Sequence, residues 1–185
     1  SNVTYATNIT ILPALLGLAP TTEPLICDIY EPSGDTETDR PVIILAHTGS
    51  FLPPVLNGQP TGSKTDSSIV ERCTRWAKKG YVAVAMSYRL GWNPISEDEN
   101  VRRSTLIQAA YRGLQDLRTA VRFFRKSITE DGNPYGITDK FAVGGIGTGG
   151  YLSLAAGTLW DYESELLLPK FMDTSQDING DGELD

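Results

Sequence analysis

The chain has 185 residues, of which 40% are hydrophobic and 21% charged, and its formal net charge is −7. This length suffices for one domain with a substantial core, since a domain of this size buries roughly 70% of the surface of its unfolded chain. The sequence contains neither an apolar run near the ~20 residues of a membrane span nor a cluster of basic residues, so we expect no membrane span and no nucleic-acid partner.

The first 30 residues contain two segments with the character of strands. Residues 3–9 alternate loosely between apolar and polar side chains, and residues 24–30 lead into a turn-forming stretch at 31–35. Short segments bounded by turn residues are typical of β-strands. We expect them to form an antiparallel pair at the edge of a sheet.

Three later segments predict strands that are buried on both faces. Residues 41–47, 81–88 and 141–143 are almost continuously apolar and do not alternate with polar residues. Such runs are typical of a parallel sheet with helices on both sides.

Helical segments separate these strands. A first helix is expected to begin near Ser68, which has capping-box spacing to Glu71, and to end at Gly80. Two further helices are expected over residues 103–126 and 151–166. The apolar stripe of the longer one consists of Leu106, Ala110, Leu114, Leu117, Val121 and Phe124. The alternation predicts an α/β fold whose mostly parallel sheet has right-handed crossovers.

Several conspicuous residues have structural interpretations. Cys27 and Cys73 fit no zinc-binding pattern, and we favour buried free thiols over a disulfide. Asp116 is expected on the outer face of the longest helix as a structural partner for an arginine, and Arg89 is expected to pair internally. Packing roles are expected for Trp76, Trp92 and Trp160.

Three motifs follow the buried strands. The sequence HTGSF occupies residues 47–51, SYRL occupies residues 87–90, and GGIGTGG occupies residues 144–150. In this order they resemble the HGGxF oxyanion loop, the YRL motif and the nucleophile elbow of α/β-hydrolases related to carboxylesterases and hormone-sensitive lipase. The resemblance covers about residues 20–160.

This resemblance implies a carboxylic-ester hydrolase that needs no cofactor for catalysis, with a small ester or an acylated carbohydrate as its ligand. Backbone N–H groups would stabilise the developing oxyanion, and small residues would allow the sharp turn of the elbow. The oxyanion hole would then be formed by Thr48, Gly49, Ser50 and Thr148, and the elbow by Gly145, Gly147, Gly149 and Gly150.

The sequence departs from the family at the residue that performs the attack. Gly147 stands at the position of the nucleophilic serine, and the sole histidine, His47, belongs to the oxyanion motif. A triad needs a nucleophile, a general base and an acid that orients the base. Thr148 lies one residue past the apex and Ser153 about one turn into the helix, so neither is expected to replace the serine. We predict that the chain as given is inactive as a serine hydrolase.

The family takes its acid and its histidine from loops after later strands. We therefore interpret residues 1–168 as the N-terminal part of an α/β-hydrolase domain that is incomplete. The strand at 141–146 would have an unpaired apolar edge, which native proteins avoid. We expect the native polypeptide to continue, or another chain to pair with this strand.

Residues 169–185 are an acidic tail that matches the first nine positions of an EF-hand-type loop. Oxygen ligands for a structural calcium ion would come from Asp177, Asn179, Asp181, the carbonyl of Glu183, and Asp185. The glutamate of the twelfth position is not in the sequence, and the alternative is a solvated tail. We interpret the tail as the start of an insertion or linker, and the calcium interpretation favours an extracellular, periplasmic or cell-surface protein.

Two functional hypotheses remain open. The parent protein is an esterase-like hydrolase, or it is a non-catalytic relative that binds a ligand or protein partner through the former active-site pocket.

Overall fold

The computed structural model describes residues 2–10, 12–13, 18–34 and 36–161. Within these residues, five strands form one sheet in the order β1-β2-β4-β3-β5. The strands are β1 (Val3–Thr10), β2 (Thr21–Tyr30), β3 (Arg40–Ala46), β4 (Val82–Met86) and β5 (Ile137–Gly145). The helices are α1 (Pro54–Asn57), α2 (Ser67–Ala77), α3 (Glu99–Thr129) and α4 (Thr148–Thr158).

The sheet is mixed, as the sequence predicts. β1 pairs antiparallel with β2, and β2 pairs antiparallel with β4. β3 is parallel to both of its neighbours, β4 and β5. β1 and β5 therefore lie at the two edges of the described sheet, and the antiparallel pair of β1 and β2 lies at one of them, as expected.

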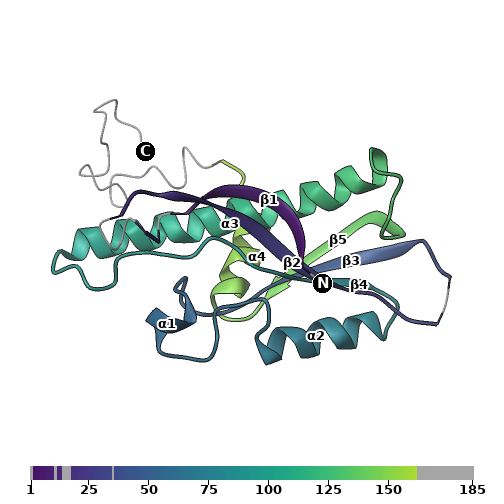
Figure 1. Ribbon diagram of the computed structural model, residues 1–185, viewed down its shortest axis with the longest axis horizontal. Helices are drawn as coiled ribbons and strands as arrows, with labels where there is room; N and C mark the ends of the chain where they lie inside the picture. Colours follow the sequence, from purple (N-terminus) through teal and green to yellow (C-terminus); the bar gives the residue numbers. More distant parts are fainter. Residues whose placement is uncertain (1, 11, 14–17, 35, 162–185) are drawn as a thin grey trace.

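Helices cover both faces of the central strands (Figure 1). Side chains of β3 alternate between the faces, so Ile44 packs with residues of α3, whereas Ile43 packs with residues of α2. All five residues of β4 are buried. This confirms the prediction that the first two apolar runs are strands buried on both faces.

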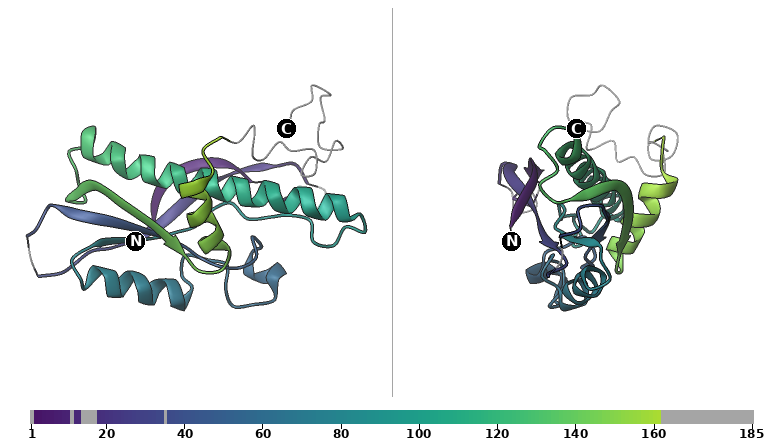
Figure 2. Two further views of the ribbon diagram at one scale, coloured as in Figure 1. Left: turned by 180° about the vertical axis from the view of Figure 1, so that it is seen from behind. Right: turned by 90° about the vertical axis from the view of Figure 1, so that its right-hand side faces the viewer.

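The third apolar run does not follow this prediction. In β5, Ala142 is exposed and Phe141 and Val143 are only half-buried. The reason is its place at the edge, where β3 is its one partner strand among the described residues. Figure 2 shows α4 beside β5, on the side of the sheet where α3 also lies.

The two cysteines lie in separate cores. Cys27 of β2 belongs to the cluster that includes α3, and Cys73 of α2 belongs to the cluster on the opposite face. Both are free and buried. The prediction of buried thiols is confirmed, and the sheet between them explains why they do not pair.

The starts of two helices differ from the predicted ones. α2 begins at Ser67, with Asp66 as its N-cap residue, so the expected capping box that starts at Ser68 is wrong. The Asp66 side chain makes no capping hydrogen bond to α2; its carboxylate accepts hydrogen bonds from the N–H groups of Gly62 and Ser63 in the loop before the helix. α3 begins at Glu99, ahead of the predicted start, because the Asp98 side chain accepts a hydrogen bond from the N–H of Asn100.

Asp116 is buried, with 1% of its surface exposed, which corrects the expectation that it lies on the outer face of α3. Its carboxylate accepts hydrogen bonds from the N–H and Nε of Arg89, at 2.8 and 3.0 Å. The predicted pairing of both residues is confirmed. This bond ties the chain after β4 to the middle of α3.

Trp160 is 88% exposed, so its predicted packing role is wrong within the described part of the chain. Trp76 packs against Tyr81 at 5.1 Å between ring centroids, and Trp92 is half-buried against the main core, as expected. α4 begins at Thr148 and ends at Thr158, a shorter helix than the predicted 151–166. Among the helices of the described ranges, none combines the length and the apolar character that a membrane crossing requires.

Candidate functional site

The segments that follow β3, β4 and β5 meet at one end of the sheet, because the carboxyl ends of parallel strands share an edge. Tyr88 lies at their junction. Its hydroxyl donates a hydrogen bond to the carbonyl oxygen of His47 at 2.8 Å and lies 3.3 Å from Oγ1 of Thr148. One buried side chain thus connects the two segments whose sequences match the oxyanion loop and the elbow.

The loop at residues 47–51 is fixed through its carbonyl groups. Every one of the five carbonyl oxygens accepts a hydrogen bond. The donors, in order along the loop, are the Tyr88 hydroxyl, Nδ1 of His47, Nδ2 of Asn57, Nε1 of Trp92 and the N–H of Gly91. A loop that is held in this way on one side presents its N–H groups in a preorganised arrangement on the other.

The backbone of this loop is left-handed over three successive residues. The φ angles are 122° at Gly49, 54° at Ser50 and 56° at Phe51. Such angles are unfavourable for the two residues that carry side chains, and strain of this kind concentrates at binding and catalytic sites. The buried ring of Phe51, packed edge-on against Tyr88, compensates for part of this strain.

The loop's N–H groups remain available. No backbone hydrogen bond among the described residues uses the N–H of Gly49, Ser50 or Thr148. Thr148 is the first residue of α4, where an N–H has no partner within the helix. These three N–H groups thus have no backbone partner among the described residues; Ser50 and Gly147 are exposed, whereas Gly49 is buried.

The turn from β5 into α4 has the shape of an elbow. Gly147 stands at its apex with φ 55° and ψ −120°, a conformation that side-chain-bearing residues rarely adopt. The neighbouring turns approach closely. A Cβ atom on Gly145 would lie 2.2 Å from the carbonyl carbon of Gly149, and one on Gly149 would lie 2.1 Å from the carbonyl oxygen of Ala46. Both positions therefore require glycine, whereas Gly150 has room for a side chain.

Neither neighbouring hydroxyl replaces the missing serine at the apex. The Ser153 hydroxyl donates to the carbonyl oxygen of Gly149 within α4, at 2.9 Å. The Thr148 hydroxyl lies next to Tyr88. A third hydroxyl lies closer to the apex: Oγ1 of Thr48 is 2.1 Å from the place that a Cβ atom of residue 147 would take.

His47 has a structural environment. It is 1% exposed, and its ring stacks on Tyr88 at 4.4 Å between centroids. Nδ1 lies 2.6 Å from the carbonyl oxygen of Thr48, which can only accept, so Nδ1 carries the proton. Burial lowers the pKa of His47 below its usual value. The neutral ring therefore supports the loop.

Three residues support the loop: Asn57 and Trp92 lie outside the sequence motifs, and Tyr88 belongs to the SYRL motif, which by itself assigns it no supporting role. Asn57 donates through Nδ2 to the carbonyl oxygens of Gly49, Leu52 and Thr61. Trp92 and Tyr88 bond to the same loop, as described above. Tyr88 could have been found as the tyrosine of the YRL motif, but Asn57 lies in a stretch rich in glycine, proline and threonine that carries no comparable signal.

The predicted calcium ligands at residues 177–185 lie outside the described residues. Within the described ranges, no group of three or more His, Cys, Asp or Glu side chains could hold a metal ion.

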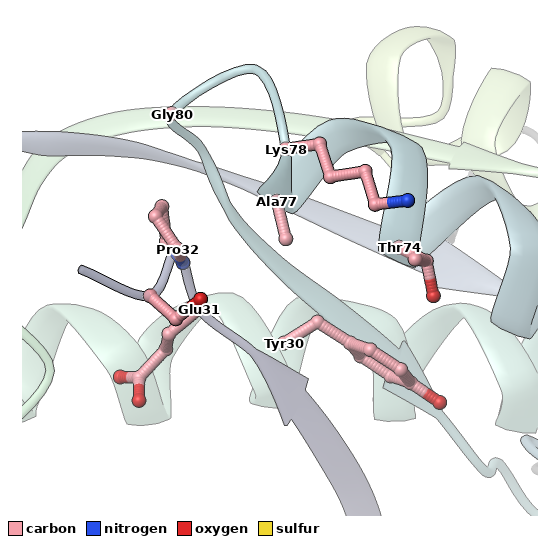
Figure 3. A pocket seen from close by; sticks show the side chains of 8 residues that line it. Tyr30, Glu31, Pro32, Thr74, Ala77, Lys78 and Gly80 are labelled. Carbon is pink, nitrogen blue, oxygen red and sulfur yellow. The ribbon is translucent and has the colours of Figure 1, made fainter.

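A shallow pocket lies at the other end of the sheet (Figure 3). It is lined by residues from the end of β2, the end of α2 and the turn before β4, namely Tyr30, Glu31, Pro32, Ser33, Thr74, Ala77, Lys78 and Gly80. Since β4 begins there and the elbow lies beyond the carboxyl end of β5, this pocket is separate from the site at residues 47–51 and 145–149.

A family model described as BD-FAE matches residues 27–180 of the chain. Three solved structures with similar folds are of esterase 2 from Thermogutta terrifontis. The form phosphorylated by paraoxon is 20% identical, with a TM-score of 0.54 over 84% of this chain and 46% of that chain. The native form, described as a thermophilic esterase from a Planctomycetes species, is 19% identical, with a TM-score of 0.52 over 100% and 50%. The apo form is 22% identical, with a TM-score of 0.52 over 84% and 44%.

The chain therefore spans about half the length of the solved structures that it matches. No curated protein matches it. The likeness to the solved structures is one of fold, and the five-stranded mixed sheet corresponds to about half of an α/β-hydrolase esterase.

Proposed function

Because this chain belongs to the BD-FAE family of esterases with the α/β-hydrolase fold, we propose that its site binds the carbonyl or carboxylate group of an ester-type ligand without forming an acyl-enzyme at residue 147. The ligand class is a small ester or an acylated carbohydrate. The N–H groups of Gly49, Ser50 and Thr148 would donate to the ligand oxygen, as in an oxyanion hole.

One observation carries this proposal. The loop at residues 47–51 is held by all of its carbonyl groups, while the apex of the facing elbow is a glycine with φ 55°. The donors that recognise an oxygen are therefore available, but the atom that would attack the ligand's carbonyl carbon is absent. Binding without covalent chemistry is the function that uses what is present.

Butyrate is a suitable probe, because one solved structure of the Thermogutta esterase has butyrate bound. We expect the protein that the gene encodes to bind butyrate in an NMR titration. The Asn57→Ala variant loses one of the two donors to the carbonyl of Gly49, the other being the N–H of Leu52, together with its bonds to the carbonyls of Leu52 and Thr61, so we expect its affinity to fall about tenfold, corresponding to ~1.4 kcal/mol.

Asn100→Ala is the matched control, since the Asn100 side chain is exposed at the start of α3, far along the chain from the loop. Equal butyrate affinity in the two variants, or no binding by the unmodified protein, would contradict the proposed site.

A carboxylic-ester hydrolase is the second candidate, and the backbone of the elbow favours it, because Gly147 keeps a conformation suited to a nucleophile elbow. Hydrolysis of p-nitrophenyl butyrate by the encoded protein distinguishes the two. Turnover at enzyme-like rates would identify a hydrolase, and the absence of turnover together with butyrate binding would support the non-catalytic relative.

We also propose that the open edge of β5 pairs with a further strand, supplied by a continuation of the polypeptide or by another chain. The exposed Ala142 and the position of β5 at the sheet edge support this. A protein partner would then share the sheet and leave the ligand site free.

A structural calcium ion at Asp177, Asn179, Asp181, Glu183 and Asp185 stays a proposal, together with the extracellular, periplasmic or cell-surface setting that it favours. It is supported by the spacing of the oxygen ligands. We expect calorimetric titration with Ca²⁺ to show one site that the Asp181→Asn substitution weakens. No heat of binding in the unmodified protein would contradict it.

A further inference from the structure

Thr48 and Gly147 come from different loops and share one small space. A Cβ atom built on Gly147 would lie 2.1 Å from Oγ1, 3.0 Å from Cβ and 3.8 Å from Cα of Thr48. The side chain of Thr48 thus fills the space in which a side chain at the apex of the elbow would begin.

Rotation of the Thr48 side chain does not free this space. Turning Oγ1 away would leave the Thr48 Cβ atom 3.0 Å from the new Cβ atom, which is tighter than nine in ten real Cβ contacts, so Thr48 would still have to shift by a few tenths of an ångström. The Cβ position is set by the backbone, which hydrogen bonds to the carbonyls of His47 and Thr48 hold in place. A side chain at residue 147 therefore requires that the Thr48 side chain turn and that its Cβ atom move aside, a shift that this backbone opposes.

The same geometry places the hydroxyl of Thr48 beside the apex of the elbow, close to the exposed Gly147. A hydroxyl can donate to a ligand oxygen and accept from a ligand hydroxyl.

We propose that Thr48 and Gly147 are a matched pair, in which the Thr48 side chain replaces the missing side chain at the apex and presents its hydroxyl to the bound ligand as a hydrogen-bonding group. Thr48 is thereby a specificity-determining residue of the site. The part that concerns the ligand rests on the proposed function, whereas the steric part does not.

A double-mutant cycle on the encoded protein tests the steric part. We expect Gly147→Ser alone to lower Tm, because the new side chain collides with Thr48. When Gly147→Ser is introduced into the Thr48→Gly variant, we expect the decrease in Tm to be at least about 3 °C smaller than in the unmodified protein. Gly157→Ser, in the open part of α4, is the control and should show equal shifts in both backgrounds.

Additive shifts at residues 48 and 147 would overturn the matched pair. If the Gly147→Ser variant does not fold, the proposal requires that the double variant, which also carries Thr48→Gly, does fold. If neither variant folds, the proposed matched pair is overturned.

Thr48→Val tests the hydroxyl, since it keeps the branched shape and removes the oxygen. We expect butyrate to bind about tenfold more weakly to this variant while Tm changes little. Unchanged affinity would overturn the role of the hydroxyl. If the unmodified protein binds no butyrate, the proposed function fails, and the double-mutant cycle still decides whether the two residues are matched.

Discussion

Single residues at this site support the loops that surround it. His47, which a motif search would assign to the oxyanion loop, is buried against Tyr88 and holds the carbonyl of its own neighbour. Arg89 and Asp116 form a buried ion pair with 2.8 Å between Nη2 and Oδ1. Burial raises the pKa of Asp116, while the hydrogen bonds from Arg89 oppose that shift. These groups position the loops through a dense set of hydrogen bonds.

The lowered pKa of His47 predicts a loss of stability on acidification. Below the ordinary histidine pKa of about 6.5, His47 binds a proton in the unfolded chain but resists protonation in the folded protein. The free energy of unfolding therefore decreases as the pH is lowered. His47→Phe keeps a ring against Tyr88 but does not titrate, and we expect urea unfolding between pH 7 and pH 5 to show a shallower loss.

The carboxyl groups of Glu23 and Asp116 have raised pKa values and act in the opposite direction, since the folded state then binds protons more readily. They are present in both proteins, so the difference between the two pH profiles belongs to residue 47. If the free energy of unfolding of the two proteins depends on pH in the same way, His47 is not the source of the loss of stability on acidification.

At the scale of elements, the elbow is determined by close approach of backbones. Gly149, in the first turn of α4, faces the carbonyl oxygens of Ala46 and His47 at the end of β3. The N–H of Ile146 also bonds to the carbonyl of Ala46, at 3.2 Å. The start of α4 is thus pressed against the strand that leads into the oxyanion-like loop.

This contact predicts unequal effects for two glycines of one helix. Gly149→Ala places a methyl group against backbone that cannot move aside, and we expect a loss of about 3 kcal/mol or more in the free energy of unfolding. Gly157→Ala meets open space, so its stability should be unchanged or higher by about 0.5 kcal/mol. Chemical denaturation of both variants provides the measurement, and equal losses would refute the close packing of the elbow.

For the whole molecule, the face around β5 and α4 combines exposed apolar side chains with an unpaired strand edge within the described chain. Leu154 is 68% and Tyr151 69% exposed on α4, and the outer edge of β5 is unpaired within the described chain. Apolar surface next to an open strand edge is typical of an interface. This agrees with a chain that spans about half the length of the esterases whose fold it shares.

We therefore expect Leu154→Glu to act differently in two contexts. In the isolated 185-residue chain it should reduce self-association, because it adds charge to the apolar face. In a protein in which β5 pairs with the proposed further strand, it should lower Tm by several degrees, because a charge would be buried. Ile95→Glu, at a position 87% exposed in the loop before α3, should change neither property. Sedimentation velocity and thermal unfolding measure the two effects. Identical behaviour of the two variants would argue against an interface.

The sequence by itself determined the fold class, the two central buried strands and the place of the elbow, because these depend on local apolar patterns and on the order of motifs. It also determined that the apex carries no nucleophile, since that is a matter of residue identity. The exposure of β5 and the burial of Asp116 were decided by tertiary structure, because they depend on which strands and loops become neighbours.

The relation between Thr48 and Gly147 also belongs to tertiary structure. The two residues are 99 positions apart in the sequence, and neither has a pattern that refers to the other. They come together because β3 and β5 are adjacent parallel strands whose carboxyl ends lie side by side. Only that pairing of strands brings a threonine from one loop into the space that a glycine leaves open in the other.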